Sequence, residues 1–187
     1  MDARVLLDAL QVAERLKDTT RHSYTAKGRH ESVAEHSWMM TLMAFFLRDE
    51  FPEANMDKVI RMCIIHDLGE CFTGDIPTFE KTAAHEKMED DLLSCWVDAL
   101  PAPYAEEMRA LYAEMAERKT LEARIYKAID SLEAVIQHNF ADLSTWIPHE
   151  YELNKVYAND KVAFSDYLTA LRAEVLRDTL DKIGEAE

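Results

Sequence analysis

The stretch that organises the chain reads Ile64-Ile65-His66-Asp67-Leu68-Gly69-Glu70, and Gly74-Asp75-Ile76-Pro77 follows closely. Apolar residues dominate from Val59 to Ile65, so the pattern predicts a helix that is buried on most sides. An imidazole and two carboxylates at the end of such a helix lose their hydration, and only ionic partners or a metal compensate that loss. The sequence therefore predicts half of a metal site here, with further ligands from distant helices.

The spacing within the stretch brings its polar side chains together. On a helix His66 and Glu70 are four residues apart and Asp67 and Glu70 three apart, so all three share one turn. Gly69 and the segment 74–77 are predicted to break the helix and to bend the chain across its end.

Length and composition predict one all-α domain. The 187 residues can bury a core without disulfides, and 4 Gly and 5 Pro against 48% hydrophobic residues favour few turns and long helices. No segment has the alternation of a strand. The three cysteines, Cys63, Cys71 and Cys95, show no paired spacing, which predicts a reducing, cytoplasmic compartment with Cys63 and Cys95 in the core.

Composition also excludes several classes of partner. No secretory signal is visible, and the longest apolar run, near Trp38 to Leu47, is too short to span a bilayer, so a soluble protein is expected. A net charge of -15 disfavours binding to a nucleic-acid polymer. It is compatible with one small phosphorylated substrate, because a divalent metal and an arginine can invert the field locally.

Capping residues predict where helices begin. Ser32 and Glu35 form a capping box, and Asn55 and Thr120 are N-cap residues for later helices. The preceding segment, 18–31, is polar and irregular and is interpreted as a solvated loop, although it concentrates cationic residues in an acidic chain.

Four residues on or beside apolar helix faces stand out: His36, His66, Asp67 and Asp130. They come from three separate helices. Two imidazoles and two carboxylates suit a divalent transition metal (Mn, Co, Fe, Ni or Zn) with more than four ligands, which leaves positions for water and a substrate oxygen. Spacing alone leaves open that the histidines are hydrogen-bonded structural residues and that solvent or a partner accommodates Asp130.

The order His36, His66-Asp67, Asp130 on a helical scaffold resembles the HD superfamily of metal-dependent phosphohydrolases. The segments 31–37, 66–70 and 73–77 more narrowly resemble the bacterial 5'-deoxynucleotidases and the related eukaryotic HD-domain-containing proteins. The match spans roughly residues 21–137. The resemblance implies a helical bundle, with one HD domain over 1–187, a metal-site core at about 21–137 and a C-terminal helix packed on it.

The resemblance also implies roles for individual residues. The metal ligands are His36, His66, Asp67 and Asp130. Glu70 matches an acidic residue that activates or positions water, and Asp75 matches a residue that contacts the sugar hydroxyl. Arg21, fifteen residues before His36, matches an arginine near the substrate phosphate.

One position departs from the family pattern. His22 stands where the bacterial deoxynucleotidases carry a tryptophan that is implicated in accepting deoxyribose over ribose, so the sequence leaves the sugar preference open. Lys127, one turn before Asp130, is interpreted either as an added positive charge at the site or as a surface lysine.

The expected function is release of phosphate from nucleoside or deoxynucleoside 5'-monophosphates. The chemistry agrees, since a metal activates water, Glu70 can orient it and Arg21 can bind phosphate oxygens. The alternatives are hydrolysis of a cyclic dinucleotide or a nucleoside triphosphate, and a metal-stabilised nucleotide-binding module without turnover. The resemblance implies a homodimer.

Other candidates are interpreted as structural. The remaining histidines with no partnered spacing are expected at the surface or at caps: His30, His138 and His149. The tryptophans are expected in the core: Trp38, Trp96 and Trp146.

Overall fold

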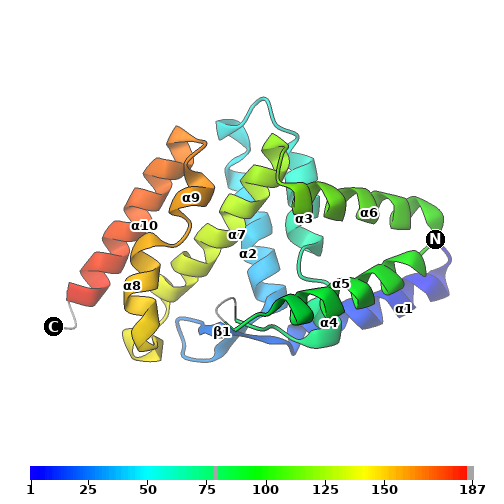
Figure 1. Ribbon diagram of the computed structural model, residues 1–187, viewed down its shortest axis with the longest axis horizontal. Helices are drawn as coiled ribbons and strands as arrows, with labels where there is room; N and C mark the ends of the chain where they lie inside the picture. Colours follow the sequence, from blue (N-terminus) through cyan, green and yellow to red (C-terminus); the bar gives the residue numbers. More distant parts are fainter. Residues whose placement is uncertain (78–79, 185–187) are drawn as a thin grey trace.

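The computed structural model describes residues 1–77 and 80–184, and helices make up nearly all of its regular structure (Figure 1). The α-helices are α1 (Ala3–Ala13), α2 (Val33–Phe46), α3 (Met56–Ile65), α4 (Glu70–Thr73), α5 (Ala83–Asp98), α6 (Ala102–Glu117), α7 (Leu121–Phe140), α8 (Pro148–Val156), α9 (Asn159–Val162) and α10 (Asp166–Gly184). The short 3-10 helices are η1 (Glu14–Lys17), η2 (Arg48–Glu50) and η3 (Leu143–Thr145). Two strands, β1 (Thr20–Tyr24) and β2 (His30–Ser32), complete the fold, and the all-α prediction is confirmed.

Helix α7 lies in the middle of the molecule (Figure 1). It packs against α2 and α3 and against α9 and α10, which lie on its other side in Figure 1. Its apolar face supplies fully buried side chains, among them Ile125, Ile129 and Leu132. Met40 of α2 and Met62 of α3 belong to the same core. Any polar side chain on the buried part of α7 must therefore find its partner within the protein.

The predicted helix starts are confirmed by their caps. Ser32 Oγ accepts the Glu35 amide, and the Glu35 side chain accepts the Ser32 amide, so both halves of the capping box form. The Asn55 side chain caps α3 by accepting the amide of Lys58, and the Thr120 side chain caps α7 by accepting the amide of Ala123. Because capping depends on residues within one turn, it can be predicted without tertiary information.

The prediction of an irregular loop over 18–31 is wrong, since β1 and β2 form an antiparallel hairpin. Thr20 pairs with Ser32 and Tyr24 with His30, and Gly28 at φ +79 lies in the connecting turn. Gln137 of α7 donates to the carbonyl of Tyr24 at 2.6 Å and fixes the hairpin on the helix. The strands are too short for their alternation to be recognised, and the contacts that hold them come from a distant helix.

The two glycines of the organising stretch behave differently. Gly69, predicted to break the helix, has helical backbone angles of φ -58 and ψ -35. A Cβ at Gly69 would lie 2.7 Å from Cγ of Glu89, so the residue permits a close approach of α5. Gly74 at φ +76 ends α4, and the predicted break is confirmed there. The sequence also predicts a long helix from Phe79 to Leu100. Phe79 lies outside the described residues, and the helix observed there, α5, begins at Ala83.

Several apolar side chains predicted in the core are exposed. Cys63 is buried, but Cys95 is exposed. Trp146 is buried, whereas Trp38 on α2 is 61% exposed. Helix α2 carries apolar residues on nearly all sides, so its periodicity could not identify the face that other helices cover. Within the described part of the chain, no helix combines the length and apolar character needed to cross a membrane.

We expect Leu132→Ala to lower the free energy of unfolding by about 2–5 kcal/mol, because it leaves a cavity in the centre of α7. The matched substitution Leu180→Ala, on an exposed part of α10, should stay within about 0.5 kcal/mol of wild type. Urea unfolding followed by circular dichroism measures both values. Equal losses for the two variants would contradict the placement of the core around α7.

Candidate metal centre

Four side chains from three helical segments converge beside α7. The structure places His36 in the first turn of α2, His66 and Asp67 directly after α3, and Asp130 in the middle of α7. Nε2 of His36 lies 3.2 Å from Oδ1 of Asp130 and 3.9 Å from Oδ2 of Asp67. Nε2 of His66 lies 2.8 Å from the same Asp67 oxygen and 4.0 Å from Oδ1 of Asp130. All four predicted ligands thus meet at one point.

Hydrogen bonds on the far side of each imidazole fix its orientation. Nδ1 of His66 lies 2.9 Å from the carbonyl oxygen of Cys63, and since a carbonyl only accepts, this nitrogen carries the proton. Nδ1 of His36 donates in the same way to Oε2 of Glu133 at 2.5 Å. Both Nε2 atoms therefore face the two aspartates, and Nε2 of His36 is hydrogen-bonded to Oδ1 of Asp130.

This arrangement fits a divalent cation. Lone pairs and anionic oxygens that face one another repel unless a proton or a cation lies between them. Nε2 of His66 is buried and has no hydrogen-bond partner among the described residues, although it lies close to Asp67. His36, His66 and Asp67 offer ligand atoms within 4.8 Å of one another, so they could hold a metal ion. The donor set of nitrogen and oxygen suits a transition metal.

The surrounding charges support anionic aspartates. Burial alone would raise the pKa of Asp130, but Lys127 and the two imidazoles hold it well below its ordinary range. Lys127 Nζ contacts Oδ2 of Asp130 at 2.5 Å, which leaves Oδ1 facing the histidines. Lys127 is therefore part of the cluster rather than a plain surface lysine. Burial and Arg21 lower the pKa of His36, but Glu133 and Asp130 outweigh them and raise it to about 9.

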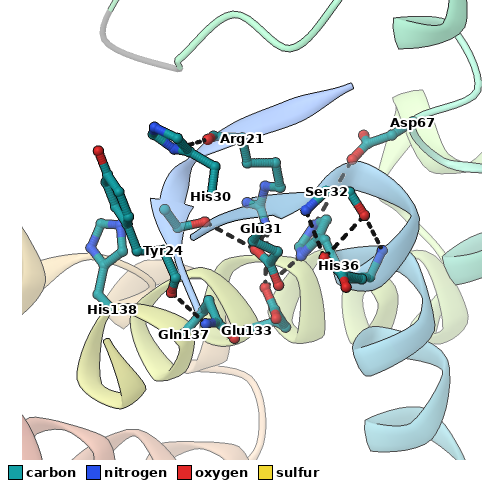
Figure 2. A network of polar contacts seen from close by, with 12 residues as sticks. Arg21, Tyr24, His30, Glu31, Ser32, His36, Asp67, Glu133, Gln137 and His138 are labelled. Atoms are coloured by element: carbon teal, nitrogen blue, oxygen red, sulfur yellow. Dashed lines mark hydrogen bonds and ion pairs between the residues drawn. The ribbon is translucent and has the colours of Figure 1, made fainter. Parts of the chain in front are cut away.

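A second polar network adjoins the cluster and was missed by the sequence analysis (Figure 2). Arg21 of β1 donates through one terminal nitrogen to Glu31 at 3.0 Å and to Glu133 at 3.2 Å. Ser23 donates to the same Glu31 oxygen at 2.9 Å. Glu133 lies one turn after Asp130 on α7, and that spacing is the signal that could have found it.

Glu31, His36 and Glu133 also lie close enough to hold a metal. Their carboxylates, however, already bind the guanidinium of Arg21, which supplies the compensating positive charge. Burial and Glu133 raise the pKa of Glu31 to about 6, while Arg21 lowers it. The two histidines and two aspartates are therefore the better metal site.

Glu70 and Asp75 lie within the field of this cluster. Glu70 is buried, and its Oε2 has no hydrogen-bond partner within residues 1–77 and 80–184. Burial and the charges of Asp67, Asp75 and Glu89 raise the pKa of Glu70 to about 10. Burial, with the charge of Asp67, also raises the pKa of Asp75, against the effect of Arg21 and His36. Both carboxyl groups therefore hold a proton more readily than an exposed carboxyl group does.

A cavity of about 110 Å³ lies next to Arg21, and its wall includes His22, Ser23, Asp75, His138 and Glu150 but none of the four side chains of the cluster. Nε2 of His22 lies 3.0 Å from the buried Glu150 carboxylate, and His138 lies 3.5 Å from it. His138 was expected at the surface or at a cap, yet it lines this cavity, and burial lowers its pKa. Arg21 and Asp75 therefore share one small polar cavity.

Curated relatives resemble most of the chain. Human 5'-deoxynucleotidase HDDC2 is 30% identical over 139 residues, which cover 72% of this chain and 67% of the relative. The 5'-deoxynucleotidase hdd1 of Schizosaccharomyces pombe is 30% identical over 136 residues, covering 68% of each chain.

Solved structures agree in fold. A predicted metal-dependent phosphohydrolase from Magnetospirillum magnetotacticum superposes with a TM-score of 0.81 at 26% identity, covering 96% of this chain and 93% of that one. The cyanophage S-2L HD phosphohydrolase DatZ, bound to dA and one catalytic Zn²⁺ ion, superposes with a TM-score of 0.58 at 21% identity, covering 94% and 96%. Because DatZ is only 21% identical, its similarity to this chain shows a shared fold and nothing more.

The family model for the HD domain matches residues 13–172, which is most of the chain and includes every residue of the cluster. The order of the histidines and aspartates, their convergence and the helical scaffold agree with this match. The chain belongs to the HD domain family.

Proposed function

We propose that the protein is a metal-dependent phosphohydrolase that releases phosphate from nucleoside or deoxynucleoside 5'-monophosphates. The observation that carries the proposal is the convergence of two imidazoles and two carboxylates, to which Glu133 links Arg21, a residue that lines a small cavity together with Asp75. The relatives named 5'-deoxynucleotidase support the same reaction, and the cavity of about 110 Å³ favours part of a small nucleotide over a polymer.

His36, His66, Asp67 and Asp130 would hold a divalent transition metal such as Mn, Co, Fe, Ni or Zn. When bound, the ion supplies Lewis acidity, which makes water acidic enough to attack phosphorus near neutral pH. Lys127 keeps one Asp130 oxygen occupied, so Asp130 offers the other oxygen to the ion. The hydrogen bonds to Cys63 and Glu133 keep both imidazoles in the tautomer that can ligate.

Glu70 is the candidate proton acceptor. Its ordinary pKa would make it a weak base, but burial and neighbouring carboxylates raise its proton affinity. With a cation held by the neighbouring cluster, the pKa of Glu70 would be raised less, and Glu70 could accept a proton. In the proposed reaction a water oxygen bonds to phosphorus, and the bond from phosphorus to O5' breaks. The water proton passes to Glu70 and from there to O5', which gives the nucleoside and inorganic phosphate.

Arg21 and Asp75 are the candidate substrate contacts. One terminal nitrogen of Arg21 is bound to Glu31 and Glu133, and the rest of its planar donor fork is available to phosphate oxygens. Asp75 lines the same cavity and can accept a hydrogen bond from a sugar hydroxyl.

We further propose a homodimer, which the family resemblance suggests. Large apolar side chains exposed on the described surface, such as Trp38, Phe46 and Ile64, are compatible with a partner. Sedimentation velocity measures the mass directly, and a monomer at micromolar concentration would count against the dimer.

The substrate class is tested by one assay of the purified protein with Mn²⁺ or Co²⁺. We expect phosphate release from a panel of 5'-monophosphates, because the cavity is small. A cyclic dinucleotide and a nucleoside triphosphate serve as comparison substrates. Faster turnover of either one would replace the monophosphate proposal, and nucleotide binding without any release would indicate a binding module. Paired ribose and deoxyribose substrates determine the sugar preference that His22 leaves open.

We expect His66→Ala and Asp67→Ala each to abolish phosphate release and to reduce bound metal, because each removes a ligand atom from the cluster. Metal content by mass spectrometry and released phosphate are measured on the same preparations. His149→Ala, at an exposed histidine, is the matched control and should keep both properties. Unchanged activity in the His66 or Asp67 variant would end the proposal.

We expect Glu70→Ala to retain metal and to lose about 10²–10⁴-fold in turnover, the range that a positioned general base contributes. Glu106→Ala removes an exposed carboxylate from α6 and serves as the control. Metal loss in the Glu70 variant would reassign this residue to holding the ion.

A further inference from the structure

Glu133 is the least exposed charged side chain beside the metal cluster, at 0% relative exposure. It lies on α7, one turn after Asp130. A single oxygen, Oε2, accepts the Nδ1 proton of His36 at 2.5 Å and a terminal N–H of Arg21 at 3.2 Å (Figure 2). One buried oxygen thus contacts both an imidazole of the cluster and the arginine of the adjoining cavity.

The simpler interpretation is that Glu133 only neutralises a buried arginine. The contacts argue against it. Glu31, itself buried, binds the same Arg21 nitrogen at 3.0 Å and already supplies one compensating charge. For Glu133 the shortest contact is to His36 and not to Arg21. Glu133 therefore accepts a hydrogen bond from the imidazole of His36, an interaction that Glu31 does not make.

We propose that Glu133 is a positioning residue that ties the metal-binding imidazole of His36 to the phosphate-binding guanidinium of Arg21. Its oxygen keeps the proton of His36 on Nδ1, so the Nε2 lone pair faces the cluster. The same oxygen fixes Arg21 relative to that imidazole. The distance between the imidazole of His36 and the guanidinium of Arg21 is thereby set by one side chain on the most buried helix. This inference rests on the proposed function.

Glu31 provides a matched comparison within the same network. Both glutamates are buried, both accept from the same nitrogen of Arg21, and both are neutralised without loss of shape by Glu→Gln. Of these two glutamates, Glu133 alone has a hydrogen bond to His36. A difference between Glu133→Gln and Glu31→Gln in metal affinity therefore reports the link to the imidazole and not a general loss of buried negative charge.

The first measurement is titration of the metal-free protein with Co²⁺, followed by visible absorption. We expect Glu133→Gln to weaken Co²⁺ binding by about 10–100-fold and to change the absorption bands, because the partner of a metal-binding histidine sets its orientation and basicity. Glu31→Gln should remain within about twofold of wild type, since the hydrogen bonds of the Glu31 side chain go to Arg21 and Ser23 and not to a histidine. Glu133→Asp, which keeps the charge with a shorter reach, should fall between the two.

The second measurement is the inhibition constant of inorganic phosphate in the Co²⁺-loaded protein. Both Gln variants should bind phosphate about fivefold or more weakly, because each loosens the hold on Arg21. The expected pattern is then specific: Glu31→Gln affects phosphate alone, and Glu133→Gln affects both ligands. Thermal unfolding of the metal-free variants checks that they fold. If Glu133→Gln does not fold, Glu133→Asp is compared with Glu31→Gln in its place.

The outcomes separate the two proposals. If the wild type binds no Co²⁺, the proposed function itself fails. If the wild type binds Co²⁺ and Glu133→Gln binds it equally well with unchanged absorption, the role of Glu133 is overturned while the proposed function stands. If Glu31→Gln weakens Co²⁺ binding as much as Glu133→Gln, the effect is one of total charge, and the positioning role is likewise overturned.

Discussion

The structure depends on the cost of placing two carboxylates, Asp130 and Glu133, on the most buried helix of the domain. An ionised group at such a depth is stable only if it is matched by opposite charge and hydrogen bonds. Each surrounding element contributes part of that match. Helix α2 brings His36, the end of α3 brings His66, and β1 brings Arg21. The packing of these segments around α7 thus also determines where the side chains of the site lie.

The same constraint explains how an acidic protein can attract an anionic substrate. The chain carries a net charge of -15, yet the side chains around the cluster include Arg21, held by the buried Glu31 and Glu133, and Lys127, held by the half-buried Asp130. A cation bound by the cluster would add to them, whereas most other carboxylates lie on the surface and are screened by solvent. The local field at the site therefore need not follow the sign of the whole molecule.

Sequence reasoning succeeded where the cause is local or where a motif carries it. The caps at Ser32, Asn55 and Thr120 depend on neighbours three residues away, and all three form. The four cluster residues were found through their order and family resemblance, because no spacing rule connects positions 36 and 130. Glu133 was not found, since its partner His36 lies 97 residues away in sequence. The β1–β2 hairpin was missed for a similar reason, and the exposed face of α2 could not be told from the buried one.

The hairpin gives the site a dependence on strand register. The pairing of β1 with β2 is irregular between Thr20 and Tyr24, and a further slip of β1 by one residue would move Arg21 away from Glu31 and Glu133 and bring a neighbour to its place. Neither Thr20 nor His22 can supply a guanidinium there. The bond from Gln137 to the Tyr24 carbonyl holds the far end of β1 to α7 and so resists such a slip. Gln137, two turns beyond Asp130 on α7, would thereby help to determine which residue of β1 faces the nucleotide.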